Sequence, residues 1–331
     1  DLHYMSFRNS YNRNPKQLWV FFSMESPRYS YCSHYVSIKE MDDWFNLTAT
    51  YKPDSNAKVS YHGFGNLDRI HGHSSYLSLF RKKYTNDQNF FAHGLNKPKK
   101  GLALWIVSHC STSSKREEYI LELQKYMQVD VYGACNSRSI PCDNYKTKAE
   151  KDSCMKDMFN SYKFYLSFEN SNCDHYITEK YWQFYYRNKF FDVNIVPIVR
   201  GASINHYGGT TFGHKTHIHA DSFDSPESLA DYINYLDRNN SAYLEYFEWK
   251  KESIRRMEKI INENHMKIIP NQTLDPSNIK EAFLIDKIIE FSDGQPGYEL
   301  FCEMCAKLHD PSYLNDLNKP PLKISEIFNP K

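Results

Sequence analysis

The sequence has no apolar run long enough to cross a membrane. Its longest runs, Leu18–Phe22 and Leu102–Val107, fall far short of the roughly 20 residues that a membrane-spanning helix needs. It also has no excess of charge, because 41 Lys+Arg stand against 40 Asp+Glu, so a broad electrostatic footprint for nucleic acid is not expected. No signal peptide or internal repeat is present, and the chain begins at Asp1, which favours the soluble part of a longer protein.

The eight cysteines are an even number, as complete disulfide pairing requires. A zinc site would need two short-spaced ligand pairs that meet, and only Cys302-x-x-Cys305 has that spacing. Three tripeptides fit the N-glycosylation pattern, and they begin at Asn46, Asn239 and Asn271. Together with the even cysteine count, they indicate the lumen of the secretory pathway.

The order of the expected elements predicts an α/β chain of two domains. The apolar strand Leu18–Phe22 ends in the polar segment Ser23-Met-Glu-Ser-Pro27, a usual place for functional residues. The polar stretch 66–100 predicts a connection between an N-terminal domain, residues 1–100, and a second domain, residues 101–293. Residues 294–331 would form a cysteine hairpin and tail. In the second domain strands are expected at 102–108, 129–132, 164–168 and 195–199, and helices at 116–127, 178–186 and from Ser225 onward.

The segment 164–180 carries the most chemistry, with the sequence Phe-Tyr-Leu-Ser-Phe-Glu-Asn-Ser-Asn-Cys-Asp-His-Tyr-Ile-Thr-Glu-Lys. A strand ends at Glu169-Asn170, a polar loop follows, and a helix is expected to begin near Thr178. The free N–H groups of a helix N-terminus suit a phosphate. Lys180 lies in the first turn, where the helix dipole disfavours a cation, so an anionic ligand beside it is one reading. The other is a solvated lysine on an ordinary helix.

This segment resembles the hallmark motif of the α1,3-fucosyltransferases, glycosyltransferase family ten. Other segments agree in order and spacing: Glu25-Ser-Pro27, Val107-Ser-His109 followed by Arg116, Val196-Pro-Ile-Val-Arg-Gly201, and the pair Cys302/Cys305. The resemblance implies a GT-B fold, with two Rossmann-like domains facing each other across a cleft, the first for the acceptor and the second for GDP-fucose. It also implies a type II membrane protein of the Golgi lumen, anchored by an N-terminal segment outside this chain.

The matching positions imply roles for individual residues. Glu25 matches the family's catalytic base, which takes the proton from the acceptor hydroxyl in an inverting displacement. Arg116 and Lys180 match cations that bind the pyrophosphate of GDP. Tyr176 and Glu179 match positions that contact the donor.

Glu169 and Asn170 also belong to the motif and are counted with the donor site, a structural role in the loop being the alternative. No Asp-x-Asp pair of the kind that holds a divalent metal for a nucleotide-sugar occurs, so no obligatory metal is expected and Mn²⁺ would at most stimulate. The histidines at 214, 217 and 219 alternate along a short segment, which favours a strand or loop over a metal site.

Cys110 and Cys173 resemble cysteines of members that fucosylate the asparagine-linked GlcNAc of the N-glycan core, and they favour that acceptor. The alternative is a Lewis-type enzyme acting on antennary N-acetyllactosamine or LacdiNAc. A second alternative, an inactive glycan-binding module, is disfavoured because such a module needs neither a base nor cations for a leaving group. Cys302 and Cys305 are expected to bond each other; otherwise one reaches Cys32 and the other a cysteine within 110–173.

Overall fold

The computed structural model describes ten stretches of the chain: residues 18–30, 42–59, 61, 100–136, 138–184, 190, 193–208, 210–211, 214–252 and 255. The chain divides into two compact units. Unit 1 consists of residues 1–66, 173–176 and 296–331, and unit 2 of residues 67–172 and 177–295. The short segment Cys173–Tyr176 therefore belongs to unit 1, although the residues on both sides of it belong to unit 2.

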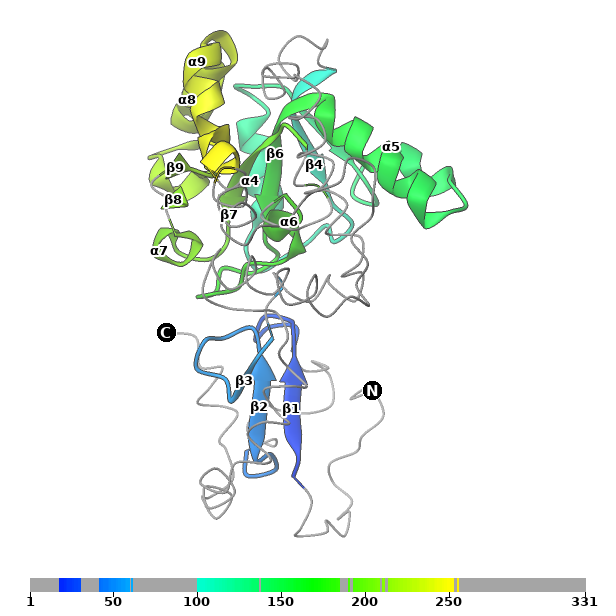
Figure 1. The fold of residues 1–331 in the computed structure, drawn as a ribbon, viewed down its shortest axis with the longest axis vertical. Helices are drawn as coiled ribbons and strands as arrows, with labels where there is room; N and C mark the ends of the chain where they lie inside the picture. Colours follow the sequence, from blue (N-terminus) through cyan, green and yellow to red (C-terminus); the bar gives the residue numbers. More distant parts are fainter. Residues whose placement is uncertain are drawn as a thin grey trace, which may run out of the picture. The chain divides into compact units, whose positions relative to one another are not determined.

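Unit 1 contains a three-stranded parallel sheet of order β1-β2-β3 (Figure 1). Its strands are β1 (Val20–Ser23), β2 (Leu47–Thr50) and β3 (Ala57–Lys58). Ala49, Ala57 and Val59 form a small buried cluster against this sheet. Strand β1 ends at Ser23, so the polar segment that contains Glu25 begins at the carboxyl end of this strand.

Unit 2 is built on a five-stranded parallel sheet of order β10-β7-β6-β4-β5. The strands are β4 (Gly101–Ile106), β5 (Val129–Tyr132), β6 (Tyr162–Phe168), β7 (Val196–Arg200) and β10 (Ile218–His219). The helices are α4 (Arg116–Leu123), α5 (Lys148–Asn160), α6 (Glu179–Trp182), α7 (Ile204–Tyr207), α8 (Pro226–Arg238) and α9 (Asn240–Leu244), and a short hairpin joins β8 (Thr210–Thr211) to β9 (His214–Lys215).

Helices cover both faces of this sheet. Alternate residues of a strand point to opposite faces, so neighbouring residues of β4 pack against different helices. Ala103 and Trp105 of β4 pack in a cluster with residues of α4 and α8, whereas Leu104 packs in another cluster with Phe159 of α5. All seven residues of β6, the central strand, are buried. Figure 1 shows α8 and α5 on either side of the strands. The α/β class with parallel sheets that the sequence predicts is confirmed.

Most elements lie where the sequence predicts them. The strand expected at 129–132 has those bounds, and α8 begins with Ser225 as N-cap and Pro226 at its first position. The expected helix at 178–186 is shorter, because α6 ends at Trp182. Helix α5 was not predicted: Phe159 is its one fully buried residue, so its apolar periodicity is weak, although Thr147 and Glu150 form a capping box at its start.

Two disulfides lie in unit 2. Cys110–Cys135 joins the loops after β4 and β5, and Cys142–Cys154 joins a 3-10 helix (Pro141–Asn144) to α5. Cys173 makes no disulfide with a described residue. Cys32, Cys302 and Cys305 lie outside the described residues, so the predicted bond between Cys302 and Cys305 stays a prediction. No helix in the described stretches combines the length and apolar character needed to cross a membrane.

Candidate active site

The backbone of Glu25 is held by two serines in the loop that follows β1. The Glu25 amide donates to Ser23 Oγ at 3.2 Å, and the Ser30 hydroxyl donates to the Glu25 carbonyl oxygen at 2.8 Å. Both serines are buried, whereas Glu25 is exposed. Strand β1 and this small network therefore fix where the Glu25 side chain leaves the backbone.

The carboxylate of Glu25 accepts a hydrogen bond from a residue far away in the sequence. The Tyr176 hydroxyl donates to Glu25 Oε2 at 2.9 Å, within unit 1. Tyr176 is only 1% exposed, and its ring makes T-shaped contacts with the rings of Tyr51 and Tyr61. Tyr176 was predicted to contact the donor; here its hydroxyl is bound to the predicted base.

In unit 2, the carboxylate of Glu169 is completely buried and bound by groups of the same motif. The Thr178 amide and hydroxyl donate to it, each at 2.8 Å, and Lys180 Nζ lies 3.3 Å from Glu169 Oε2. Burial raises the pKa of Glu169, against the charge of Lys180, which lowers it. The contacts of Glu169 thus lie within the protein and tie the end of β6 to the start of α6.

Lys180 lies between two carboxylates. Its Nζ is 3.3 Å from buried Glu169 and 3.1 Å from Glu179, whose side chain is 63% exposed. Burial acts to lower the pKa of Lys180, but the charges of Glu169 and Glu179 outweigh it and raise the pKa. Lys180 is therefore a cation across the physiological range, with one fixed and one exposed acidic neighbour.

Arg116 and Asn170 hold neighbouring loops at the carboxyl ends of β4 and β6. The Arg116 guanidinium is buried, donates to the Phe168 carbonyl at 2.7 Å and to the His109 carbonyl at 3.1 Å, and lies over the ring of Trp105. The Asn170 carbonyl accepts from the Ser114 amide at 3.3 Å.

Five of the predicted site residues lie in unit 2, whereas Glu25 and Tyr176 lie in unit 1.

Gly201, which follows β7, is required by its contact with Glu169. Its φ is +146°, and a Cβ placed there would lie 2.7 Å from Cβ of Glu169. Any residue with a Cβ at position 201 would therefore clash with Glu169, which pairs with Lys180. Ser23 and Ser30 are supporting residues that the sequence does not single out, since serines in polar loops carry no distinctive signal. Thr178 is expected from the sequence only as the start of a helix, and its bond to Glu169 is not.

The side chains of His217 and His219 contact neighbouring residues. His217 is buried with its Nδ1 2.7 Å from Thr216 Oγ1, and rings of Tyr181 and Tyr207 pack on it. His219 Nε2 lies 3.0 Å from the Ala202 carbonyl oxygen. In the part of the chain that the structure describes, no group of three or more His, Cys, Asp or Glu residues could hold a metal ion.

Acidification is expected to destabilise the protein through His217. Burial, and secondly the charge of His219, lower the pKa of His217 to about 4. Between pH 6.5 and about pH 4, His217 is protonated in the unfolded chain but not in the folded protein. The free energy of unfolding therefore falls with falling pH by up to about 3 kcal/mol. Thermal midpoints at pH 7 and pH 4.5 check this for the wild type and His217→Gln. An advantage of the wild type over the variant that is equal at both pH values would contradict it.

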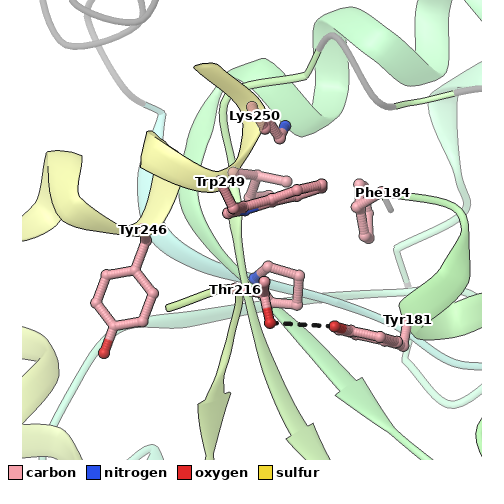
Figure 2. A pocket seen from close by; sticks show the side chains of 8 residues that line it. Tyr181, Phe184, Thr216, Tyr246, Trp249 and Lys250 are labelled. Carbon is pink, nitrogen blue, oxygen red and sulfur yellow. Dashed lines mark hydrogen bonds between the residues drawn. The ribbon is translucent and has the colours of Figure 1, made fainter. Parts of the chain in front are cut away.

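A small pocket lies beside α6 in unit 2 (Figure 2). Figure 2 shows the Trp249 ring across it and the Tyr181 hydroxyl directed at Thr216. Lys250 is buried there and donates to the Val193 carbonyl at 2.8 Å. None of the residues predicted for catalysis or donor binding lines this pocket, which is bounded by Tyr181, Phe184, Ile195, Pro197, Thr216, Tyr246, Trp249 and Lys250.

Two of the three predicted glycosylation sites lie in the described residues. The Asn46 side-chain oxygen accepts from the Trp19 amide at 3.0 Å. Asn239 is the N-cap of α9, and its side-chain nitrogen donates to the Tyr235 hydroxyl at 3.0 Å. Asn271 lies outside the described residues, and glycosylation at all three stays a prediction.

Comparison with protein families gives two matches, which together include residues of both units. The family described as "Glycosyltransferase family 10 (fucosyltransferase) C-term" matches residues 96–276, which include the segment 164–180. The family described as "Fucosyltransferase, N-terminal" matches residues 2–62, which include Glu25.

Several curated proteins are similar to this chain. A glycoprotein 3-alpha-L-fucosyltransferase A of Drosophila melanogaster is 34% identical over 72% of this chain and 41% of its own length. An alpha-(1,3)-fucosyltransferase of Caenorhabditis elegans is 34% identical over 74% of this chain and 49% of its own. A human 4-galactosyl-N-acetylglucosaminide 3-alpha-L-fucosyltransferase is 35% identical, over 72% and 55%. The chain thus spans about half the length of the curated relatives it matches. A solved alpha1,3-fucosyltransferase aligns at 19% identity over 64% of this chain and 52% of that chain, with a TM-score of 0.35.

Proposed function

The chain belongs to glycosyltransferase family 10, and from this premise we propose that it is an inverting α1,3-fucosyltransferase that uses GDP-fucose. The observation that carries the proposal is Glu25, an exposed carboxylate whose backbone and Oε2 are both held in place at the end of β1. A fixed carboxylate open to solvent suits a general base that must reach an incoming hydroxyl.

The proposed reaction is a single displacement at the anomeric carbon of fucose. Glu25 takes the proton of the acceptor hydroxyl while that oxygen forms its bond to the anomeric carbon. The bond from this carbon to the GDP oxygen breaks, and GDP leaves with the electron pair, so a β-linked donor becomes an α-linked product. One carboxylate on the acceptor side is what this displacement needs, whereas a retaining double displacement would need a second, nucleophilic one.

Lys180 is proposed to stabilise the charge that develops on departing GDP. The buried carboxylate of Glu169 favours the charged form of Lys180. A phosphate of the donor would displace the exposed Glu179 from Lys180, and Glu179 could then bind the sugar or ribose hydroxyls of the donor. Arg116 is proposed as the second cation. Because its donors reach backbone carbonyls, it would act through its charge and by holding the loops of the donor site, along with Asn170.

The proposed acceptor is the asparagine-linked GlcNAc of the N-glycan core. Cys110 and Cys173 support it through their resemblance to core-type members, and a relative from Drosophila melanogaster is named a glycoprotein fucosyltransferase. The second candidate is a Lewis-type activity on antennary N-acetyllactosamine or LacdiNAc, favoured by the similar identity of the human relative, which is named for a galactosylated acceptor. The disulfides and sequons fit the proposed location in the Golgi lumen as a type II membrane protein.

A panel of acceptors tests this proposal. Labelled GDP-fucose is incubated with the chain and matched glycopeptides, one with only a free core GlcNAc position and one with only antennal N-acetyllactosamine or LacdiNAc positions. Transfer to the first supports the core acceptor, and transfer only to the second replaces it by the Lewis-type alternative. Binding of glycan with no transfer to either, and no glycan-dependent release of GDP, would identify an inactive glycan-binding module.

Removal of divalent metal is expected to leave most of the fucosyl transfer intact. The sequence has no Asp-x-Asp pair, and Lys180 and Arg116 are proposed to neutralise the pyrophosphate in place of a metal. The measurement is the initial rate after exhaustive EDTA treatment, with and without added Mn²⁺. A modest stimulation by Mn²⁺ agrees with the proposal, whereas complete loss that only Mn²⁺ restores contradicts it.

A further inference from the structure

We propose that Tyr176 is a positioning residue for the base, in that its hydroxyl holds one carboxylate oxygen of Glu25 so that the other faces the acceptor hydroxyl. This inference rests on the proposed function of Glu25. It assigns to Tyr176 a part in the proton transfer at unit 1; the contact with the sugar-nucleotide donor that the sequence resemblance implied stays a prediction.

The first support is the asymmetry of the contact. Glu25 is exposed and Tyr176 is 1% exposed, so the hydrogen bond of 2.9 Å anchors the tip of a surface side chain to a group in the protein interior. Oε2 is the anchored oxygen, and Oε1 makes no hydrogen bond to a described residue. A glutamate on the surface otherwise samples several rotamers, and a fixed one keeps the reacting oxygen within reach of its proton donor.

The second support is that the protein itself holds Tyr176 in place. Its ring makes a T-shaped contact with Tyr51, with ring centroids 5.1 Å apart, and another with Tyr61 at 6.2 Å. The Tyr61 hydroxyl in turn donates to the carbonyl of Met24, the residue before Glu25. The tyrosine that binds the carboxylate and the tyrosine that binds the adjacent backbone therefore pack on each other.

The third support is the backbone that delivers Tyr176. His175 has a φ of 60°, in the left-handed region that a residue with a Cβ adopts at a cost, and the Tyr176 amide closes a turn on the Cys173 carbonyl at 3.2 Å. This turn is the short stretch of the 164–180 motif that belongs to unit 1. A costly local conformation that directs one side chain to one carboxylate is explained if that contact is needed.

The test is kinetic and uses Tyr176→Phe, which keeps the ring and its packing but removes the hydroxyl. The loss of one charge-assisted hydrogen bond predicts a fall in kcat of roughly tenfold to a hundredfold, with the affinity for GDP and the KM for GDP-fucose unchanged. Tyr162→Phe is the matched control, because the buried Tyr162 hydroxyl also donates to a carboxylate, that of Asp130 at 2.8 Å, at the opposite end of β6 from Glu169. This control is expected to affect thermal stability and to leave kcat within about twofold.

A double-mutant cycle with Glu25→Gln separates the possible outcomes. If Tyr176 acts through Glu25, Tyr176→Phe costs little further activity in the Glu25→Gln background. An unchanged kcat with weaker GDP binding would overturn the proposal in favour of a donor contact, and an equal loss in both backgrounds would overturn it as well. Failure of the proposed function gives a different pattern, in which Glu25→Gln alone retains its turnover. If the double variant is too slow to measure, the split between kcat and GDP affinity in Tyr176→Phe decides alone.

Discussion

Glu25→Gln is expected to lower the turnover of fucosyl transfer by roughly 10²–10⁴, the range that loss of a general base typically costs. Glutamine keeps the size of the side chain, and its carbonyl oxygen can still accept from the Tyr176 hydroxyl, so the loop after β1 is preserved. What is lost is a group that can take the proton. The measurement is steady-state kinetics together with calorimetric titration of GDP, whose affinity is expected to stay nearly constant.

Glu245→Gln is the matched control for this variant. Glu245 is also exposed, and its ion pair with Lys215 lies on the surface of unit 2, so its loss is expected to change neither turnover nor GDP affinity measurably. A Glu25→Gln protein that keeps more than about a tenth of the wild-type turnover places the base elsewhere.

Lys180→Ala is expected to change both ligand binding and stability. Loss of one charge-assisted contact to the pyrophosphate weakens GDP by roughly tenfold to a hundredfold. The same change leaves the buried carboxylate of Glu169 without its cation, which is expected to cost about 2–4 kcal/mol. This lies below the cost for a fully buried pair, because 26% of the Lys180 side chain is exposed and water partly screens it.

The double variant Glu169→Gln/Lys180→Ala distinguishes the two effects. A neutral glutamine can still accept from the Thr178 amide and needs no cation, so the double variant is expected to recover most of the thermal stability. The affinity for GDP is expected to remain low. Unchanged GDP affinity in Lys180→Ala would remove Lys180 from the donor site, and full recovery of GDP affinity in the double variant would show that its effect was structural.

The sequence predicts the sheet of unit 2 well because its strands are buried on both faces. Continuous apolar runs such as Leu102–Val107, bounded by polar segments, are a strong local signal, and Ser225-Pro226 is an equally local signal for the start of α8. Helix α5 lacks such a signal, because charged residues are spread along it and Phe159 alone is fully buried. The capping box of Thr147 and Glu150 is the one local feature of the sequence that indicates where α5 begins.

The site shows the limit of local reasoning. The residue types were identified from the motif, but their partners were not, since Glu25 and Tyr176 are 151 residues apart in the sequence. In the same way, nothing local indicates that the Arg116 guanidinium reaches the carbonyl at the end of β6, or that Glu169 is buried beneath Lys180. A hydrogen-bond partner brought in by tertiary structure decides whether a charged residue faces a ligand or the protein.

The anomeric configuration of the product tests the role of Glu25 as the base of an inverting transfer. The chain is incubated with GDP-β-L-fucose and a glycopeptide bearing the N-glycan core, and the new linkage is assigned by NMR from the coupling of the fucose anomeric proton and from its correlation to the acceptor carbon. Inverting transfer with Glu25 as base predicts one product, α-linked fucose on O3 of a GlcNAc residue, formed by the wild type and nearly absent with Glu25→Gln. A β-linked product, or an α-linked product formed equally well by Glu25→Gln, would contradict the account.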